Sequence, residues 1–184
     1  MAFVLGKTSL ARLEGVHPDL VRVVKRAIEL TTVDFSVLEG VRSYKRQAEL
    51  YAKGRTAPGP VVTWTMASKH RVQSDGFGHA VDLVPHPLDW NDLAKFDAIY
   101  AAMMEAAKIE GVEVRSGMDW DRDGKPRERR ETDPLEPLLE KGVHGVEGAP
   151  AQIAWEIAGQ NGAWQQGNRQ GAAKRKATEQ HRRA

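Results

Sequence analysis

The spacing of apolar residues along the chain predicts three helices. In residues 18–30, apolar side chains recur every three or four positions and so share one helical face: Leu20, Val21, Val24, Ala27 and Ile28. Residues 92–110 are expected to form a longer helix, which Gly111 ends. Ser43 has the side chain of a helix N-cap and predicts a shorter helix that runs to about Lys53.

Shorter apolar runs between these helices predict strands over residues 35–41, 81–84 and 112–115. Residues 54–68 contain Pro58-Gly59-Pro60 and are expected to form a long loop, and loops of this length commonly carry function. Helices and strands of this kind, without an internal repeat, predict an α+β core.

Composition narrows the class of protein. A chain of 184 residues with 41% hydrophobic and 28% charged residues is typical of a soluble globular domain. No apolar run is long enough to span a membrane, and the first seven residues lack the pattern of a secretory signal, so we expect no stable membrane insertion. Because the chain has no cysteine, disulfides and thiolate metal sites are excluded.

The C-terminal segment differs from the rest, and we expect residues 1–148 to form the domain and residues 149–184 a C-terminal helix with a basic tail. A short helix over residues 152–157 is expected to pack an apolar side chain on the core, and a basic tail follows it. The cationic residues of this tail face a single acidic one, Glu179: Arg169, Lys174, Arg175, Lys176, Arg182 and Arg183. The tail is either a solvated terminus or a patch for an anionic surface. No helix-turn-helix or zinc-finger pattern accompanies it, so we expect no nucleic-acid partner.

His70 and Asp82 are the most informative residues of the chain. His70 ends a polar loop, whereas Asp82 lies within the apolar run Ala80-Val81-Asp82-Leu83-Val84. A carboxylate in a buried strand is costly unless a positive partner compensates it. A zinc ion shared with His70 would be such a partner, because histidine nitrogen and aspartate oxygen are ordinary zinc ligands. The alternative is an aspartate that accepts hydrogen bonds from a nearby turn.

Three sequence blocks occur in an order that resembles one peptidase family. The first joins Ser68-Lys69-His70 to Gly78-His79-Ala80-Val81-Asp82-Leu83. Residues 40–56 are similar to a G-x-R-S-x-x-x-Q-x-x-L-Y-x-x-G-R-T segment, and Gly117-Met118-Asp119-Trp120 resembles a Gly-x-Asp-Trp block. Together they resemble the zinc D,D- and L,D-peptidases of bacterial cell-wall peptides. This family includes D-alanyl-D-alanine carboxypeptidases and the L-alanyl-D-glutamate peptidase endolysins of phages.

The resemblance implies a single-domain zinc peptidase of the hedgehog-like type, with a small antiparallel sheet flanked by helices. It implies metal-assisted amide hydrolysis with Zn²⁺ as the cofactor. The ligands would be His70, Asp82 and a later histidine. Arg42 matches an arginine that stabilises the oxyanion or a substrate carboxylate, and its alternative is a surface salt bridge. Gln47 and Ser68 match substrate-binding or loop-ordering positions.

The first block departs from the family in its spacing. The family places the histidine seven residues before the aspartate, and Asp75 occupies that position here. His70 lies twelve residues before Asp82, so we interpret residues 71–75 as an insertion that lengthens the metal loop. Asp75 as a ligand is the alternative. His79 occupies a variable position, and we expect it to line the pocket or to be exposed.

The third ligand is less clear, because the expected Asp-x-x-His, followed by an aromatic or apolar residue and Glu, is absent. We favour His144, with Glu140 or Asp133 as the general base, because imidazole suits zinc. The alternative keeps the Asp-x-x-ligand spacing with Asp133 and Glu136. If His144 is an ordinary surface histidine, the site is incomplete and the chain binds without cutting.

Of the family's activities, the resemblance favours the phage endolysin that hydrolyses the L-alanyl-D-glutamate bond of peptidoglycan stem peptides. We expect a monomer, made in the host cytoplasm, that reaches the wall in the periplasm after pore formation. The basic tail would then contact the anionic outer-membrane surface. The rival with the same chemistry is a D-alanyl-D-alanine carboxypeptidase or dipeptidase, and the rival of another class is a non-catalytic cell-wall-binding module.

Overall fold

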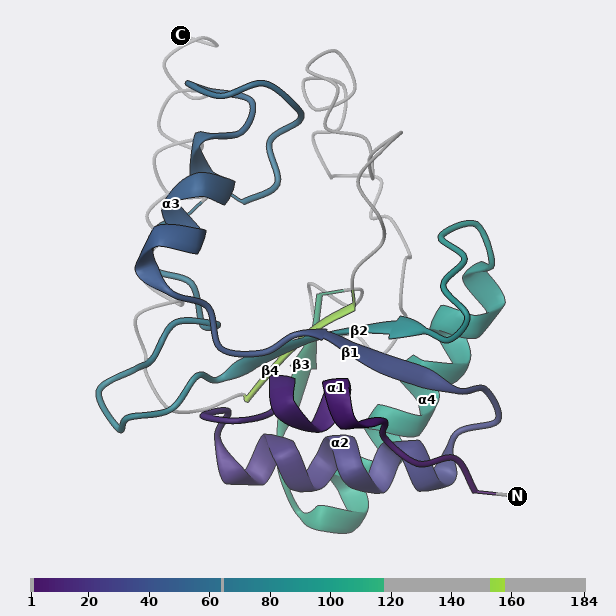
Figure 1. Cartoon of the computed structure of the whole chain (residues 1–184). Helices are drawn as coiled ribbons and strands as arrows, with labels where there is room; N and C mark the ends of the chain where they lie inside the picture. Colours follow the sequence, from purple (N-terminus) through teal and green to yellow (C-terminus); the bar gives the residue numbers. More distant parts are fainter. Residues whose placement is uncertain (1, 64, 118–152, 158–184) are drawn as a thin grey trace, which may run out of the picture.

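A four-stranded antiparallel sheet organises the chain in the computed structural model, which describes residues 2–63, 65–117 and 153–157 (Figure 1). The strands and helices follow one another along the sequence as α1 Lys7–Arg12, α2 Pro18–Leu30, β1 Phe35–Glu39, α3 Tyr44–Ala52, β2 Ala80–Pro85, α4 Leu93–Glu110, β3 Val114–Ser116 and β4 Ile153–Ile157. This confirms the predicted α+β class with a small antiparallel sheet and helices.

The strand order of the sheet is β1-β2-β4-β3, so the strand that is last in sequence lies between β2 and β3. In the β2–β4 pair, Asp82 lies opposite Ala154 and Val81 lies opposite Trp155. Directly opposed residues of an antiparallel pair point to the same face of the sheet. The side chains of Asp82 and Ala154 therefore share one face, and those of Val81 and Trp155 share the other.

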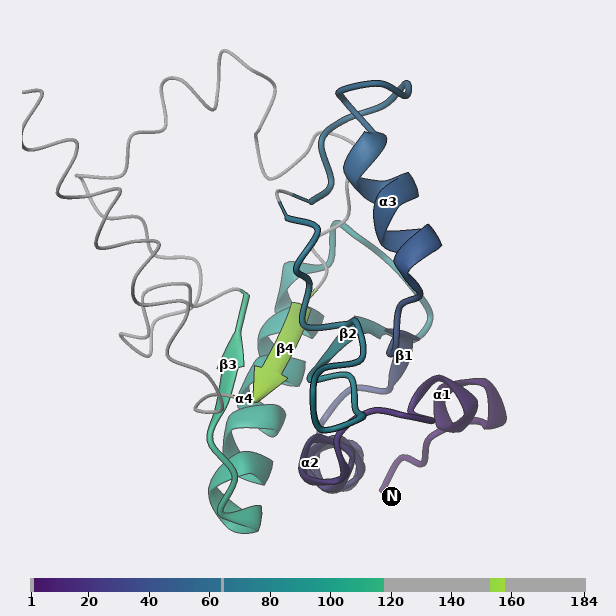
Figure 2. The same cartoon turned by 90° about the vertical axis from the view of Figure 1, so that its left-hand side faces the viewer.

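Helices cover the two faces of the sheet unequally. In Figure 1, α1 and α2 lie beneath the sheet whereas α3 rises above it, and Figure 2 shows the same separation from the side. The core joins α2 and α4 to the sheet, and its largest fully buried apolar side chains come from all three: Leu20, Phe35, Leu83, Phe96, Ile99, Met103 and Trp155. Trp155 packs on Tyr100 of α4 with ring centroids 5.6 Å apart. The α3 face thus remains for polar side chains.

Local signals place the helix ends as the sequence predicts. The Ser43 hydroxyl accepts a hydrogen bond from the Arg46 N–H at 3.1 Å and caps α3. Gly111 ends α4 with a φ of 64°, a conformation that glycine adopts without strain. Among the described helices, none is both long enough and apolar enough to cross a membrane.

Two elements differ from the prediction. The short helix α1 was not expected, and the helix expected over residues 152–157 is wrong, because this segment is strand β4. The segment is too short for the spacing of its apolar residues to distinguish a helix from a strand. It forms a strand because it pairs with β2 and β3. Burial of Trp155 on the core is confirmed.

Candidate metal centre

His70 and Asp82 come together on the α3 face of the sheet, as the sequence predicts. The Nε2 atom of His70 lies 3.5 Å from Oδ2 of Asp82. Both residues are buried, with 6% of His70 and 2% of Asp82 exposed. The loop before β2 positions the imidazole and β2 itself positions the carboxylate, so the two groups meet although twelve positions separate them.

Main-chain contacts orient the imidazole of His70. Its Nδ1 lies 2.8 Å from the carbonyl oxygen of Gly40, which can only accept, so Nδ1 carries the proton and Nε2 presents its lone pair toward Asp82. The Arg42 N–H donates to the His70 carbonyl at 2.8 Å, which ties the same two segments together again. Gly40 is required here, because a Cβ atom would lie 1.9 Å from the carbonyl oxygen of Arg12.

The distance between the two side chains suits a shared metal ion better than a hydrogen bond. Hydrogen bonds between nitrogen and oxygen are about 2.7–3.2 Å long, and the His70–Asp82 separation of 3.5 Å exceeds that range. Two ligands of a tetrahedral zinc ion, with bonds of about 2.0–2.1 Å, lie about 3.4 Å apart. His70 Nε2 and Asp82 Oδ2 therefore fit as two neighbouring ligands of one zinc ion.

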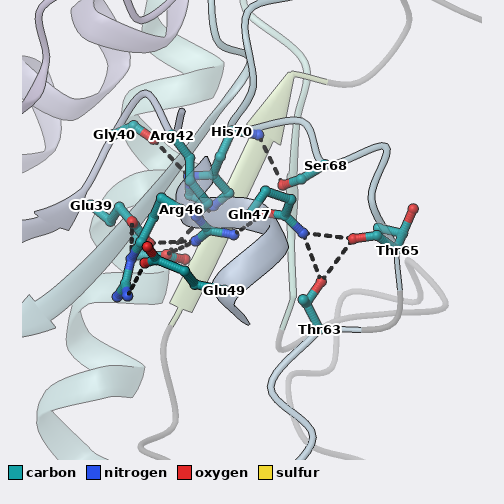
Figure 3. A network of polar contacts seen from close by, with 11 residues as sticks. Glu39, Gly40, Arg42, Arg46, Gln47, Glu49, Thr63, Thr65, Ser68 and His70 are labelled. Carbon is teal, nitrogen blue, oxygen red and sulfur yellow. Dashed lines mark hydrogen bonds and ion pairs between the residues drawn. The ribbon is translucent and has the colours of Figure 1, made fainter. Parts of the chain in front are cut away.

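Arg42 forms the centre of a polar network beside these two residues (Figure 3). Its Nη2 donates to Glu39 and lies 3.4 Å from Asp82 Oδ2, and its Nη1 donates to the Gln47 side-chain oxygen at 2.8 Å. Only 8% of Arg42 is exposed, so the surface salt bridge considered for it is excluded. Its Nε–H has no partner among the described residues.

Gln47 connects this network to the long loop after α3. Its amide nitrogen donates to Thr63 Oγ1 at 3.2 Å and to the Thr65 carbonyl at 2.6 Å, and its side chain is fully buried. Figure 3 shows the amide of Gln47 pointing toward the two threonines. The Ser68 hydroxyl accepts from the His70 N–H at 3.3 Å. In these contacts Gln47 and Ser68 order the loop around the centre.

The acidic side chains of this network outnumber its basic side chains. The carboxylates of Glu39, Glu49 and Asp82 face two guanidinium groups, because Arg42 pairs with Glu39 and Asp82, and Arg46 pairs with Glu39 and Glu49. Three carboxylates thus face two guanidinium groups, and a cation bound at His70 and Asp82 would balance this excess of acidic side chains.

Strand β4 places no histidine or carboxylate directly opposite Asp82. Ala154 of β4 lies opposite Asp82 and points to the same face, and its methyl group cannot bind a metal. Trp155 and Glu156 match the aromatic residue and the glutamate that follow the third ligand in the expected pattern, whereas Ala151 and Ala154 stand where its aspartate and histidine would be. The pair Trp155-Glu156 is therefore a partial match that sequence analysis did not use.

The residues favoured for the remaining roles lie outside the described part of the chain. They are the third-ligand candidates His144 and Glu136 and the base candidates Asp133 and Glu140. Of the Gly-x-Asp-Trp block, only Gly117 is described, and its N–H donates to the Ala154 carbonyl at 2.7 Å. The block therefore begins beside strand β4.

Asp75 and His79 are not where the sequence analysis placed them. Asp75, the alternative ligand, bonds with His79 instead of joining His70 and Asp82, with 2.7 Å between Asp75 Oδ2 and His79 Nε2. His79 is 3% exposed, so of the two expectations for this residue the exposed histidine is wrong. Its ring contacts His17 at the start of α2.

Comparisons with known proteins agree with the fold and the sequence blocks. A family model described as phage L-alanyl-D-glutamate peptidase matches residues 1–137. The L-alanyl-D-glutamate peptidase of Escherichia phage T5 is 35% identical over 127 residues, which are 67% of this chain and 86% of the phage T5 protein. The crystal structure of a Serratia marcescens L-Ala D-Glu endopeptidase superposes with a TM-score of 0.57 and 27% identity, covering 84% of this chain and 90% of the other.

Proposed function

Because the chain belongs to the phage L-alanyl-D-glutamate peptidase family, we propose that it is an endolysin that hydrolyses the L-alanyl-D-glutamate bond of peptidoglycan stem peptides with the help of Zn²⁺. One observation carries the metal dependence. His70 Nε2 and Asp82 Oδ2 are buried, oriented toward each other and 3.5 Å apart, as two ligands of one ion are.

In this proposal His70 and Asp82 hold the zinc ion together with His144. Bound zinc polarises the scissile carbonyl and lowers the pKa of a water molecule toward neutrality. Glu140 or Asp133 would serve as the general base, accepting a proton from the attacking water and returning it to the leaving amine. Gly40 keeps the imidazole of His70 in the required tautomer through its carbonyl oxygen.

Arg42 has two functions in the proposed site. Through Nη2 it fixes the orientation of the Asp82 carboxylate, and through Nη1 it anchors Gln47 and hence the long loop. Its fixed positive charge lies beside the ligands, where negative charge develops on the substrate carbonyl during hydrolysis.

The site of action follows from the substrate, since peptidoglycan lies outside the cytoplasmic membrane. We propose that the chain is made in the host cytoplasm, acts as a monomer and reaches the wall in the periplasm after a separate pore has formed. The basic C-terminal tail would add electrostatic contact with the anionic outer-membrane surface.

Mass spectrometry of digested Gram-negative peptidoglycan tests the activity. Zinc-loaded protein should release fragments with a new D-glutamate amino terminus, and a chelator-treated sample should not. His70→Ala should abolish the cleavage, whereas His86→Ala, which removes an exposed histidine elsewhere, should retain it. Loss of terminal D-alanine would assign the carboxypeptidase activity instead. Binding to the wall without cleavage would leave only the wall-binding module.

A further inference from the structure

Three side chains outside the His70–Asp82 centre converge at the start of α2. His17, Asp75 and His79 each offer one ligand atom, and these atoms lie within 4.8 Å of one another. Asp75 Oδ2 lies 2.7 Å from His79 Nε2 and 3.9 Å from His17 Nε2. The two imidazole rings meet edge to face, with centroids 5.1 Å apart. One carboxylate thus faces two imidazoles.

The backbone holds this cluster together independently of the side chains. The His17 N–H donates to the Gly78 carbonyl at 2.8 Å, and the Gly78 N–H donates to the Gly15 carbonyl at 2.9 Å. The loop also closes on itself, because the Gln73 N–H donates to the Phe77 carbonyl at 2.8 Å. These bonds fix the loop that carries Asp75 against the segment that carries His17. The three ligand groups are therefore brought together before any ion binds.

Both imidazoles direct Nε2 toward the Asp75 carboxylate. Nδ1 of His17 accepts from the Asp19 N–H at 3.2 Å, so in the neutral ring the proton is on Nε2, which faces Asp75. Metal binding at Nε2 would move that proton to Nδ1, which lies 3.8 Å from the Asp19 carboxylate. Nδ1 of His79 is buried without a partner among the described residues, so the polar contact of this ring is through Nε2, toward Asp75.

The cluster has the ligand chemistry of zinc. Desolvation raises the pKa of Asp75, but hydrogen bonds from His79 and from the Phe77 N–H, with the charge of His79, outweigh it and hold the pKa below its usual value. Asp75 therefore carries its charge at neutral pH. Two imidazoles and one carboxylate suit zinc, whereas calcium and magnesium prefer oxygen ligands alone. About a third of the Asp75 side chain is exposed, which leaves a path for an ion and a water molecule.

We propose that His17, Asp75 and His79 bind a second zinc ion, which fixes the loop that carries His70. The link to the first centre is short, because the His79 N–H donates at 2.7 Å to the carbonyl of Lys69, the residue before His70. Asp75 belongs to the insertion over residues 71–75 that separates His70 from Asp82. The insertion therefore contains Asp75, a ligand of the second ion, and this residue faces His17 at the start of α2.

Zinc stoichiometry of the full-length chain tests the proposal. Equilibrium titration with Zn²⁺ alone compares the wild type with three variants: Asp75→Asn, His17→Asn and Asp82→Asn. Asparagine at position 17 keeps a helix-capping side chain. Asp82→Asn disrupts the His70–Asp82 centre. We expect Asp75→Asn and His17→Asn each to lose one bound zinc ion and Asp82→Asn to lose the other. His86→Asn is the matched control at an exposed histidine and should lose none.

The outcomes separate this proposal from the proposed function. Unchanged zinc binding in folded Asp75→Asn and His17→Asn, checked by far-ultraviolet circular dichroism, would overturn the second site and leave a hydrogen-bonded cluster. Loss of all zinc in Asp75→Asn with none lost in Asp82→Asn would support the second site and refute the metal assignment at Asp82. A loss in each variant supports both.

Discussion

Placing a histidine at position 154 tests whether strand β4 faces the metal. Ala154 lies opposite Asp82 on the same face of the sheet and is followed by Trp155 and Glu156, the residue types expected after the third ligand. Cross-strand partners have Cβ atoms about 4.5–5.5 Å apart, so an imidazole at this position extends beside the Asp82 carboxylate. We therefore expect Ala154→His to replace a third ligand that has been removed elsewhere, in the His144→Ala background.

The size of the effect follows from the number of ligands. Structural zinc sites with four protein ligands bind with about 10–16 kcal/mol, which is about 2.5–4 kcal/mol for each ligand. Since 1.4 kcal/mol corresponds to a tenfold change, His144→Ala should weaken zinc binding by about 10²–10³-fold. The double variant His144→Ala/Ala154→His should recover most of that loss.

Competition with a chromophoric chelator measures the zinc dissociation constants of His144→Ala and of the double variant on the full-length chain. Ala154→Leu in the same background adds comparable bulk without a ligand atom and should recover nothing. If the double variant is folded but binds zinc as weakly as His144→Ala alone, position 154 does not face the metal. If His144→Ala itself leaves zinc affinity unchanged, His144 is not the third ligand, and Glu136→Ala is the variant to measure next.

Three further predictions concern the residues around the centre. Asp82→Asn should lose the zinc ion of the His70–Asp82 centre and peptidoglycan cleavage together, and a variant that still cleaves at the wild-type rate would disprove the ligand role of Asp82. Gly40→Ala places a Cβ atom 1.9 Å from the Arg12 carbonyl oxygen and displaces the Gly40 carbonyl that accepts from the His70 imidazole. Zinc affinity measured by titration should therefore fall about 10–100-fold. Gly6→Ala, where an added Cβ has no atom within 4 Å, should leave the affinity unchanged. Arg42→Lys keeps the charge but leaves the buried side-chain oxygen of Gln47 without its donor. Urea unfolding should therefore show a free energy of unfolding that is lower by about 1–3 kcal/mol. An unchanged unfolding midpoint would contradict the buried network.

The sequence by itself determined the features that depend on neighbouring residues. The helix α2 follows from the spacing of its apolar side chains, and the ends of α3 and α4 follow from Ser43 and Gly111, whose roles are local. The first metal block needs no knowledge of the fold either, because His70 lies in a loop and Asp82 lies in the strand that follows it in the sequence.

Only the tertiary structure decided what depends on contacts between distant segments. A five-residue apolar segment is compatible with helix or strand, and only insertion between β2 and β3 makes β4 a strand and sets Ala154 opposite Asp82. His17 likewise meets His79 through a loop that folds back on the start of α2. No short-range pattern specifies these contacts, because the energy of each arises from pairing and burial between parts of the chain that lie far apart in sequence.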